Sequence, residues 1–237
     1  MNKVESALKS LANPEKALLL QRFFKTGKGD YGEGDIFLGV MVPQQRKIAK
    51  DAAQRLSLED IQKLLSSKIH DKRMIALFIL LENYKKAKKA KDEQEKEKIF
   101  NFYIKNIKNI NNWDLVDLSA PNIVGDFLLS RDRKLLYSLA KSHSIWEKRI
   151  AIISTFTFIR ANDFNDTLKI SELLINDSHD LIHKAVGWML RELGKHNQHA
   201  EEKFLRKHYK SMPRTMLRYA IERFPEEKRK AYINGNI

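Results

Sequence analysis

The segment Lys148-Arg149-Ile150-Ala151 recurs in approximate form along the chain, and this recurrence decides the expected fold. In each copy a basic or polar group is followed by a small alanine. The other copies are Arg46-Lys47-Ile48-Ala49, Arg73-Met74-Ile75-Ala76, Asp117-Leu118-Ser119-Ala120, His183-Lys184-Ala185 and Arg218-Tyr219-Ala220. The alanines follow one another at intervals of roughly 27 to 44 residues, the range of repeats built from helical pairs. Small residues let adjacent helices approach closely, so we predict an all-α chain that forms a curved α-solenoid. Residues one turn before the alanines would line a shared concave face. A generic α-solenoid with coincidental alanine spacing is the alternative.

Local signals predict helices along most of the sequence. Asn13 precedes Pro14 and an apolar run, which is typical of a helix start. Pro43 stands near the first turn of a second helix, and Ser57 opens a segment with capping-box character. Residues 71–84 carry apolar side chains at helical spacing, and strand-like alternation is nearly absent. We expect one domain that covers residues 1–237.

The composition is strongly basic. The 237 residues include 44 Lys and Arg against 30 Asp and Glu, a formal net charge of +14. Such an excess indicates a nucleic-acid partner, with an anionic membrane surface as the weaker alternative. The absence of cysteine excludes disulfides and thiolate chemistry and suits a reducing cytosol. We expect no signal peptide, because the stretch from Met1 to Ser10 lacks an apolar run. We also expect no membrane span, because no apolar run reaches the roughly 18 residues that a span needs.

Residues 26–39 interrupt the helical pattern. They hold five of the nine glycines, so a good helix is excluded there. We predict an ordered loop or a short β-hairpin, with Tyr31 near its tip. Lys25, Lys28 and the glycine-rich backbone could approach phosphates, but the spacing of a nucleotide-binding P-loop is missing.

The segment Asn111-Asn112-Trp113-Asp114-Leu115-Val116-Asp117-Leu118-Ser119-Ala120 carries the strongest functional signal. Trp113 and Asp117 are four residues apart and would share one face of a helix. A carboxylate beside an indole on a basic protein is unusual. Asp114 could compete for a functional role, but it would point about 100° away from Trp113. Two plainer interpretations stay open: a tryptophan at helical spacing is more often part of the core, and Asp117 could be a surface ion-pair partner of Arg149 or Lys148.

Three further stretches combine with this segment into a family resemblance. They are Phe37-Leu38-Gly39-Val40-Met41-Val42-Pro43, Trp146-Glu147-Lys148-Arg149-Ile150-Ala151-Ile152 and Ile182-His183-Lys184-Ala185-Val186-Gly187-Trp188-Met189-Leu190-Arg191-Glu192. Together these motifs resemble the AlkD family of DNA alkylation repair proteins over nearly the whole chain. The resemblance implies a curved stack of HEAT-like helical repeats with a basic concave face for duplex DNA. It also implies a monomer in the bacterial cytosol or nucleoid that needs no metal or cofactor.

The resemblance implies a small site. Asp117 matches the catalytic aspartate of the family, Trp113 and Trp188 match two aromatic residues that pack against the deoxyribose, and Arg149 matches a phosphate-binding arginine. Tyr31 matches a DNA-contacting tyrosine near the N-terminus, although the family places that tyrosine on a helix. From the repeat register we add Lys148, Arg46, Arg73 and Arg218 as candidate phosphate contacts.

The enzymes of this family hydrolyse the N-glycosidic bond of cationic N3- and N7-alkylpurines in duplex DNA without flipping the base. An alkylated purine is already positively charged, so it leaves without a general acid. The sugar then becomes oxocarbenium-like, and a carboxylate stabilises that charge or orients water. Indole faces favour a cationic partner as well.

Two other functions stay open at this point. A noncatalytic paralogue that binds damaged or branched DNA on the same scaffold is the main alternative, and a protein-binding α-solenoid is the second. The pair His179 and His183 lacks an added acidic ligand, so a zinc site is disfavoured. No motif of a serine nucleophile is present.

Overall fold

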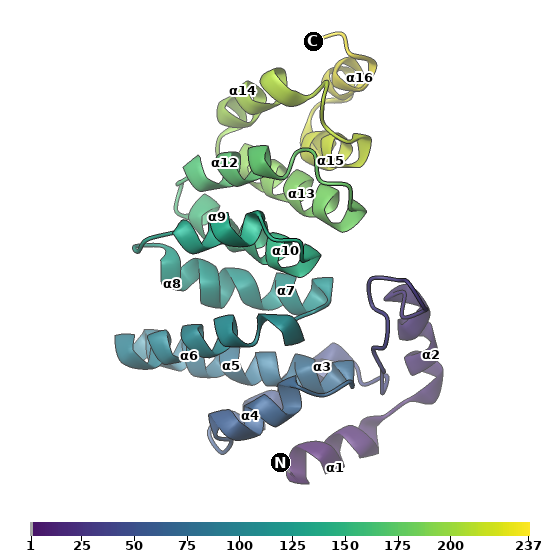
Figure 1. Ribbon diagram of the computed structural model, residues 1–237, viewed down its shortest axis with the longest axis vertical. Coiled ribbons are helices and arrows are strands. Elements are labelled where there is room, and N and C mark those ends of the chain that lie inside the picture. The colour runs from purple at the N-terminus through teal and green to yellow at the C-terminus, as the bar shows by residue number, and fades with distance from the viewer. Residues whose placement is uncertain (1) are drawn as a thin grey trace. The chain divides into compact units, whose positions relative to one another are not determined.

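The computed structural model describes residues 2–237, and over that range the chain is helical with no β-strand (Figure 1). It divides into two compact units, the first ending at Leu115 and the second beginning at Val116. The predicted all-α class is confirmed. The expectation of one domain over residues 1–237 stays a prediction, because a stack of helical repeats can be divided between any two neighbours.

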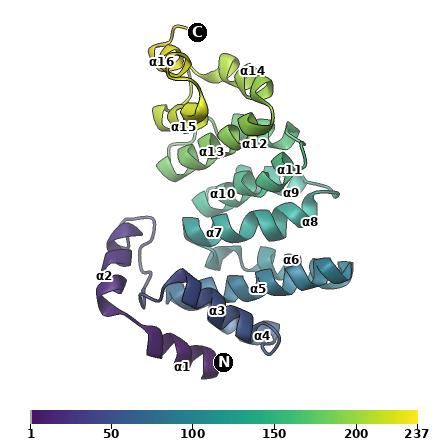
Figure 2. The ribbon, with the colours of Figure 1, turned by 180° about the vertical axis from the view of Figure 1, so that it is seen from behind.

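The first unit is built around one long helix. Its elements are α1 (Asn2–Leu11), α2 (Pro14–Phe23), α3 (Val42–Ala52), α4 (Leu58–Leu65), α5 (His70–Ala90), α6 (Glu93–Lys105) and a 3-10 turn (Ile107–Asn109). Helices α3, α4 and α6 all pack on α5, and α1 packs on α3. Helix α2 buries none of its own residues and lies beside the glycine-rich segment in both views (Figures 1 and 2).

The second unit continues the same pairing. Its helices are α8 (Asp126–Leu128), α9 (Lys134–Ala140), α10 (Ile145–Ser154), α11 (Phe156–Arg160), α12 (Asn165–Leu173), α13 (Asp180–His196), α14 (Gln198–His208), α15 (Arg214–Ala220) and α16 (Glu226–Asn234). A π-helical turn (Pro121–Gly125) precedes α8, and a 3-10 turn (Ile221–Arg223) follows α15. Helix α7 (Trp113–Ala120) crosses the boundary between the units. Helices α10, α12, α14 and α15 pack on α13, so each helix contacts its neighbours in sequence, as in HEAT-like repeats.

The recurring alanines lie where the repeat interpretation predicts. Ala49, Ala76, Ala120, Ala151, Ala185 and Ala220 are all buried. Helix α13 shows why small residues are required: a Cβ added at Gly187 would come within 2.5 Å of the Met216 carbonyl oxygen. Helices α13 and α15 are therefore in close contact at this point, and larger residues here would force them apart.

The predicted helix starts are confirmed. The Asn13 side chain accepts a hydrogen bond from the Lys16 backbone N–H, and Ser57 caps α4 in the same way through Asp60. Pro43 lies in the first turn of α3. The helix expected over residues 71–84 is the central part of α5. These ends are local in origin, because each cap satisfies a backbone donor that the helix itself leaves unpaired.

The glycine-rich segment is an ordered loop of successive turns, so the hairpin alternative is wrong. Its one extended contact within the described chain is an isolated bridge between Ile36 and Ile69, which joins it to the start of α5. Gly39 is left-handed, with φ of +77°, and a Cβ there would lie 2.2 Å from the Asn13 carbonyl oxygen. The turns and this close approach require glycine, whereas a paired strand would not tolerate so many glycines. The segment therefore forms a loop.

Across the described residues, none of the helices combines the length and the apolar character that crossing a membrane requires.

We expect the buried carboxyl of Glu201 to make the protein less stable as pH rises. Burial raises the pKa of Glu201 from 4.5 to about 8. The folded state therefore holds this proton more tightly than the unfolded chain does. Its contribution is fully present below pH 4.5 and is lost as pH rises towards 8. Glu201→Gln has no proton to lose, and urea unfolding at pH 8.5 should show it more stable than wild type by on the order of 2 kcal/mol.

Glu227→Gln is the matched control, because Glu227 is an exposed residue of the same unit. It should change stability equally at pH 5 and pH 8.5. A Glu201→Gln protein whose stability followed pH as the wild type does would contradict the assignment.

Candidate functional site

A buried ion pair connects three helices of the second unit. Asp117 lies on α7 and Arg149 on α10. Arg149 Nε donates to Asp117 Oδ1 and Nη2 donates to Oδ2, both at 2.7 Å. Its Nη1 donates to the carbonyl oxygen of Leu181 on α13 at 2.6 Å. The planar guanidinium thus binds the carboxylate through a bidentate pair of hydrogen bonds and connects it to the first turn of α13.

The two members of this pair differ in exposure. The Arg149 side chain is 6% exposed, whereas that of Asp117 is 17% exposed. The negative end of the pair therefore lies nearer the surface. Residue types alone left open whether Asp117 pairs with Arg149 or Lys148. Arg149 is its partner here, and Lys148 instead donates to Asp177 at 2.6 Å.

Trp188 lies on α13, two turns after Leu181. It is half-buried, and its indole N–H donates to Glu192 Oε1 at 3.1 Å. Its ring lies 5.9 Å from the ring of Phe156, between centroids, at a tilt of 49°. The indole is therefore oriented by a hydrogen bond at one end and by an aromatic contact, and part of it stays accessible.

Trp113 belongs to an aromatic cluster in the first unit. Its ring stacks on Phe24, with centroids 5.2 Å apart and planes 20° apart, and it meets Phe23 edge-on at 6.0 Å. Phe24 stacks in turn on Phe37 of the glycine-rich loop at 5.0 Å. Both tryptophans are therefore half-buried: neither is a fully buried core residue, and neither is fully exposed. The end of helix α2 and the loop form the wall on which Trp113 rests.

A buried polar network lies behind this cluster. His70, the first residue of α5, lies between two carboxylates: its Nδ1 is 3.1 Å from Asp35 Oδ2 and its Nε2 is 2.9 Å from Asp114 Oδ2. Asp35 also accepts from Arg73 at 2.7 Å and from Asn112 at 3.2 Å. Burial alone would lower the pKa of His70, but its hydrogen bonds to Asp114 and Asp35 outweigh burial and raise that pKa. Burial alone would raise the pKa of Asp35, but the hydrogen bonds from His70 and Arg73 outweigh burial and lower it.

The sequence interpretation missed this network. Its members are separated by 35 to 77 residues, and no short motif brings them together. The one local signal was Asp35, one of three acidic residues in the glycine-rich segment, and aspartate there is ordinarily a turn residue.

The remaining predicted residues lie in different environments. The hydroxyl of Tyr31 donates to the Phe23 carbonyl oxygen at 3.4 Å, so Tyr31 packs back on the end of α2. Arg46 is exposed, with its guanidinium 4.3 Å from the centre of the Phe78 ring. The structure corrects the prediction for Arg73. Its side chain is buried and forms an ion pair with Asp35, a buried carboxylate of the loop that needs a cation. Arg73 therefore does not offer its charge to a phosphate.

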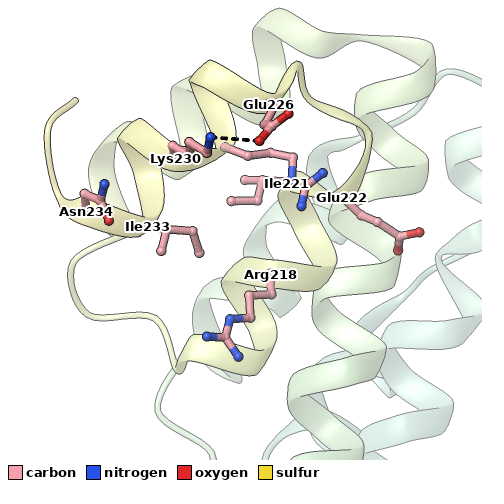
Figure 3. Close-up of a pocket in the computed structure, with 8 residues that line it drawn as sticks. Arg218, Ile221, Glu222, Glu226, Lys230, Ile233 and Asn234 are labelled. Carbon is pink, nitrogen blue, oxygen red and sulfur yellow. Dashed lines mark ion pairs between the residues drawn. The ribbon is translucent and has the colours of Figure 1, made fainter.

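Arg218 lies on an exposed rim at the end of the second unit. With residues of α16 it lines a pocket of about 490 Å³ (Figure 3). Lys230 and Glu226, one turn apart on α16, form an ion pair at the edge of that pocket at 2.8 Å (Figure 3). Acidic and basic side chains alternate there, so Arg218 is accessible to an anion without being part of a purely basic patch. A shared concave face for the basic residues stays a prediction.

The His179 and His183 pair has structural contacts. His179 Nδ1 accepts the Leu181 backbone N–H at 3.1 Å and so caps α13. Burial lowers the pKa of His179, which favours the neutral ring that this acceptor role requires. Within the described part of the chain, no three His, Asp or Glu side chains gather as a metal site would need.

Residues 4–224 match the family model of the DNA alkylation repair enzymes. The chain belongs to that family. In fold it is similar to a predicted DNA alkylation repair enzyme from Enterococcus faecalis, with a TM-score of 0.69 and 16% identity over 91% of this chain and 97% of that one. No curated protein sequence matches it significantly. Membership indicates a DNA-binding protein that acts in DNA alkylation repair.

We expect the Asp117–Arg149 pair to be strongly coupled in stability. A double-mutant cycle with Asp117→Asn and Arg149→Lys, measured by urea unfolding, should give a coupling of about 1 to 3 kcal/mol, because lysine cannot form the two-point contact. The Asp180–Lys184 pair, one turn apart on α13 and much more exposed, serves as the control. Its coupling should be below about 0.5 kcal/mol. Equal couplings would contradict a preorganised buried pair.

Proposed function

We propose that this protein is a DNA glycosylase that hydrolyses the N-glycosidic bond of cationic N3- and N7-alkylpurines in duplex DNA. The observation that carries the proposal is the Asp117–Arg149 pair, with its carboxylate at the more exposed end. A carboxylate fixed in place before the substrate arrives can stabilise a developing positive charge without reorganising.

In the proposed reaction the bond from C1′ of the deoxyribose to the purine nitrogen breaks first. The electron pair of that bond neutralises the cationic base, so no general acid is needed. The sugar becomes oxocarbenium-like, Asp117 stabilises it or orients the water that adds to C1′, and the proton of that water leaves to solvent. No metal or cofactor is required for these steps.

Arg149 has a different role in this proposal from the one expected by resemblance alone. Two of its nitrogens hold Asp117 and a third binds the Leu181 carbonyl oxygen. We assign it first to positioning the carboxylate. Contact with a DNA phosphate stays a prediction for this side chain.

Trp113 and Trp188 are proposed to pack against the deoxyribose of the lesion. Trp113 and Asp117 lie one turn apart on α7, so an indole and a carboxylate are presented by the same helix. Most glycosylases extrude the target nucleotide into a pocket. Here the base is proposed to stay in the duplex, as the family resemblance implies. Damaged or branched duplex DNA, bound by a monomer, is the proposed partner.

A noncatalytic DNA-binding role is the second candidate, and one observation favours it. Tyr31 lies in a glycine-rich loop and packs on α2, instead of standing on a DNA-contacting helix. A protein with weakened groove contacts could keep affinity for DNA through its positive charge and lose excision.

Release of 7-methylguanine and 3-methyladenine from alkylated duplex DNA tests the proposal directly. We expect wild type to release both, and Asp117→Asn to slow release by on the order of 100-fold while most DNA binding remains. The swap keeps the shape of the side chain and removes the charge that opposes the sugar cation. Asp180→Asn, on an exposed aspartate of α13, should leave the rate unchanged. Unchanged release by Asp117→Asn would exclude this site, and binding without release by wild type would favour the second candidate.

DNA binding should weaken steeply with salt, because basic side chains displace counterions from the phosphates. Arg46→Gln and Arg218→Gln should each reduce the slope of log affinity against log salt by about 1 if that residue contacts one phosphate. Fluorescence anisotropy with an undamaged duplex, at salt concentrations from roughly 50 to roughly 300 mM, provides the slopes. Lys134→Gln, at a 91%-exposed lysine already paired with Asp132, is the comparison. A slope near zero for wild type would argue against phosphate contacts altogether.

A further inference from the structure

His70 lies between two acceptors. Both neighbours, Asp35 and Asp114, are carboxylates, and both ring nitrogens of His70 are within hydrogen-bond distance of them. A neutral imidazole has one N–H donor, whereas an imidazolium has two. The geometry is satisfied on both sides only when the ring carries both protons. Phe37 stacks on the ring at 4.4 Å between centroids, and Phe24 lies 5.3 Å away at a tilt of 36°.

The charged groups around this ring come from three elements. Asp35 belongs to the glycine-rich loop, Asp114 to α7, and Arg73 and Asp71 to α5. Helix α2 contributes the aromatic ring of Phe24, which follows its last residue. The two carboxylates beside the nitrogens outweigh Arg73 and burial, which is why the pKa of His70 lies above 6.5.

The same network holds Trp113 on both sides. Asn112 precedes it, donates to Asp35, and accepts the Trp113 backbone N–H at 2.8 Å. Asp114 follows it and binds His70. The ring of Phe24 contacts both His70 and the Trp113 indole. The backbone of Trp113 and the wall under its ring are thus fixed by one set of buried hydrogen bonds.

We propose that His70 is a positioning residue whose imidazolium form holds the Trp113 indole in place, so that loss of its proton loosens the indole and slows excision at alkaline pH. The structural half of this inference, that protonated His70 holds the Trp113 indole, stands alone. The catalytic half, that losing the proton slows excision, rests on the proposed contact of Trp113 with the lesion.

The two carboxylates lose unequally when the proton leaves. Asp35 is 4% exposed and keeps donors from Arg73 and Asn112. Asp114 is 17% exposed, and its Oδ2 has His70 as its partner. Water can solvate the more exposed Asp114 carboxylate when it loses its donor, whereas it cannot reach Asp35, so the remaining proton stays on Nδ1, towards Asp35. The lone pair on Nε2 then faces the Asp114 carboxylate, and that contact breaks.

Titration by NMR tests the structural half in the full chain. With ¹⁵N-labelled histidine and tryptophan, His70→Gln and Trp113→Phe assign the two signals. We expect the Trp113 indole N–H to shift with the same midpoint as the His70 ring, above pH 6.5. His70→Gln should abolish that shift. A Trp113 signal that ignores the His70 titration, or a His70 midpoint at or below 6.5, would overturn the inference.

Single-turnover release of 7-methylguanine against pH tests the catalytic half. His70→Gln should slow release by about tenfold or more and remove the alkaline decline, with less than about a twofold change in the DNA dissociation constant. Asp114→Asn is the sharper variant: an amide can accept from the protonated ring or donate to the neutral one, so its rate at pH 7 should stay near that of wild type while the alkaline decline disappears.

Gln45→Met is the matched structural control. Gln45 is buried and uncharged, and it anchors the end of the same loop by donating to the Val40 carbonyl oxygen at 2.7 Å. The change should lower stability and keep the alkaline decline. If it removed that decline as His70→Gln does, the effect would be ordinary destabilisation and the inference would be wrong.

The two proposals fail separately. A wild-type protein that releases no base, but whose Trp113 signal follows His70, would end the glycosylase proposal and leave the positioning of Trp113 by His70 intact. Normal release that showed no alkaline decline would end the inference about His70 and leave the glycosylase proposal standing.

Discussion

The second unit depends on the side chain of Arg149. It is buried on α10, and its donors reach a carboxylate on α7 and a carbonyl oxygen on α13. A buried guanidinium without partners would be costly, so the positions of α7 and α13 are constrained by the need to supply acceptors. Helix α10 packs on α13, and both acceptors lie within 2.7 Å of the guanidinium. The same ion pair therefore serves the structure and the proposed chemistry. Asp117 accepts hydrogen bonds from Arg149, and Asp117 is also the carboxylate assigned to stabilise the sugar cation.

The first unit is held together by different interactions. Helix α2 buries none of its own residues, and the glycine-rich loop has no ladder of backbone bonds to hold it. Asp35 and Asp71 provide the missing connection, since each accepts several hydrogen bonds and joins the loop to α5 or α7. The aromatic rings then cover the polar network from one side. Buried charge is used here where apolar contact is scarce, and this leaves an ionisable histidine in contact with Phe24, the ring on which Trp113 stacks.

The positive charge of the chain is only partly available to a ligand. Arg73, Arg149 and Lys148 are each paired with an aspartate, at 2.6 or 2.7 Å. Arg46 and Arg218, from the same repeat register, are exposed. A net charge of +14 therefore describes the attraction of the whole molecule to DNA better than it identifies contacts. Contacts with DNA require exposed basic side chains, and a basic side chain that is held in an ion pair inside the protein is not exposed.

The sequence by itself determined what is local or periodic. Helix starts at Asn13 and Ser57, the burial of the recurring alanines and the break at residues 26–39 follow from caps, spacing and glycine content, each of which acts within a few residues. The segment around Trp113 and Asp117, combined with three further motifs, was also enough to indicate the family. Only the tertiary structure decided that Arg149, not Lys148, holds Asp117, that Arg73 is buried, and that Asp35, His70 and Asp114 form one network. Those outcomes depend on contacts between residues 29 to 77 positions apart, where pairing is set by which helices pack and how closely, and no short-range pattern encodes that choice.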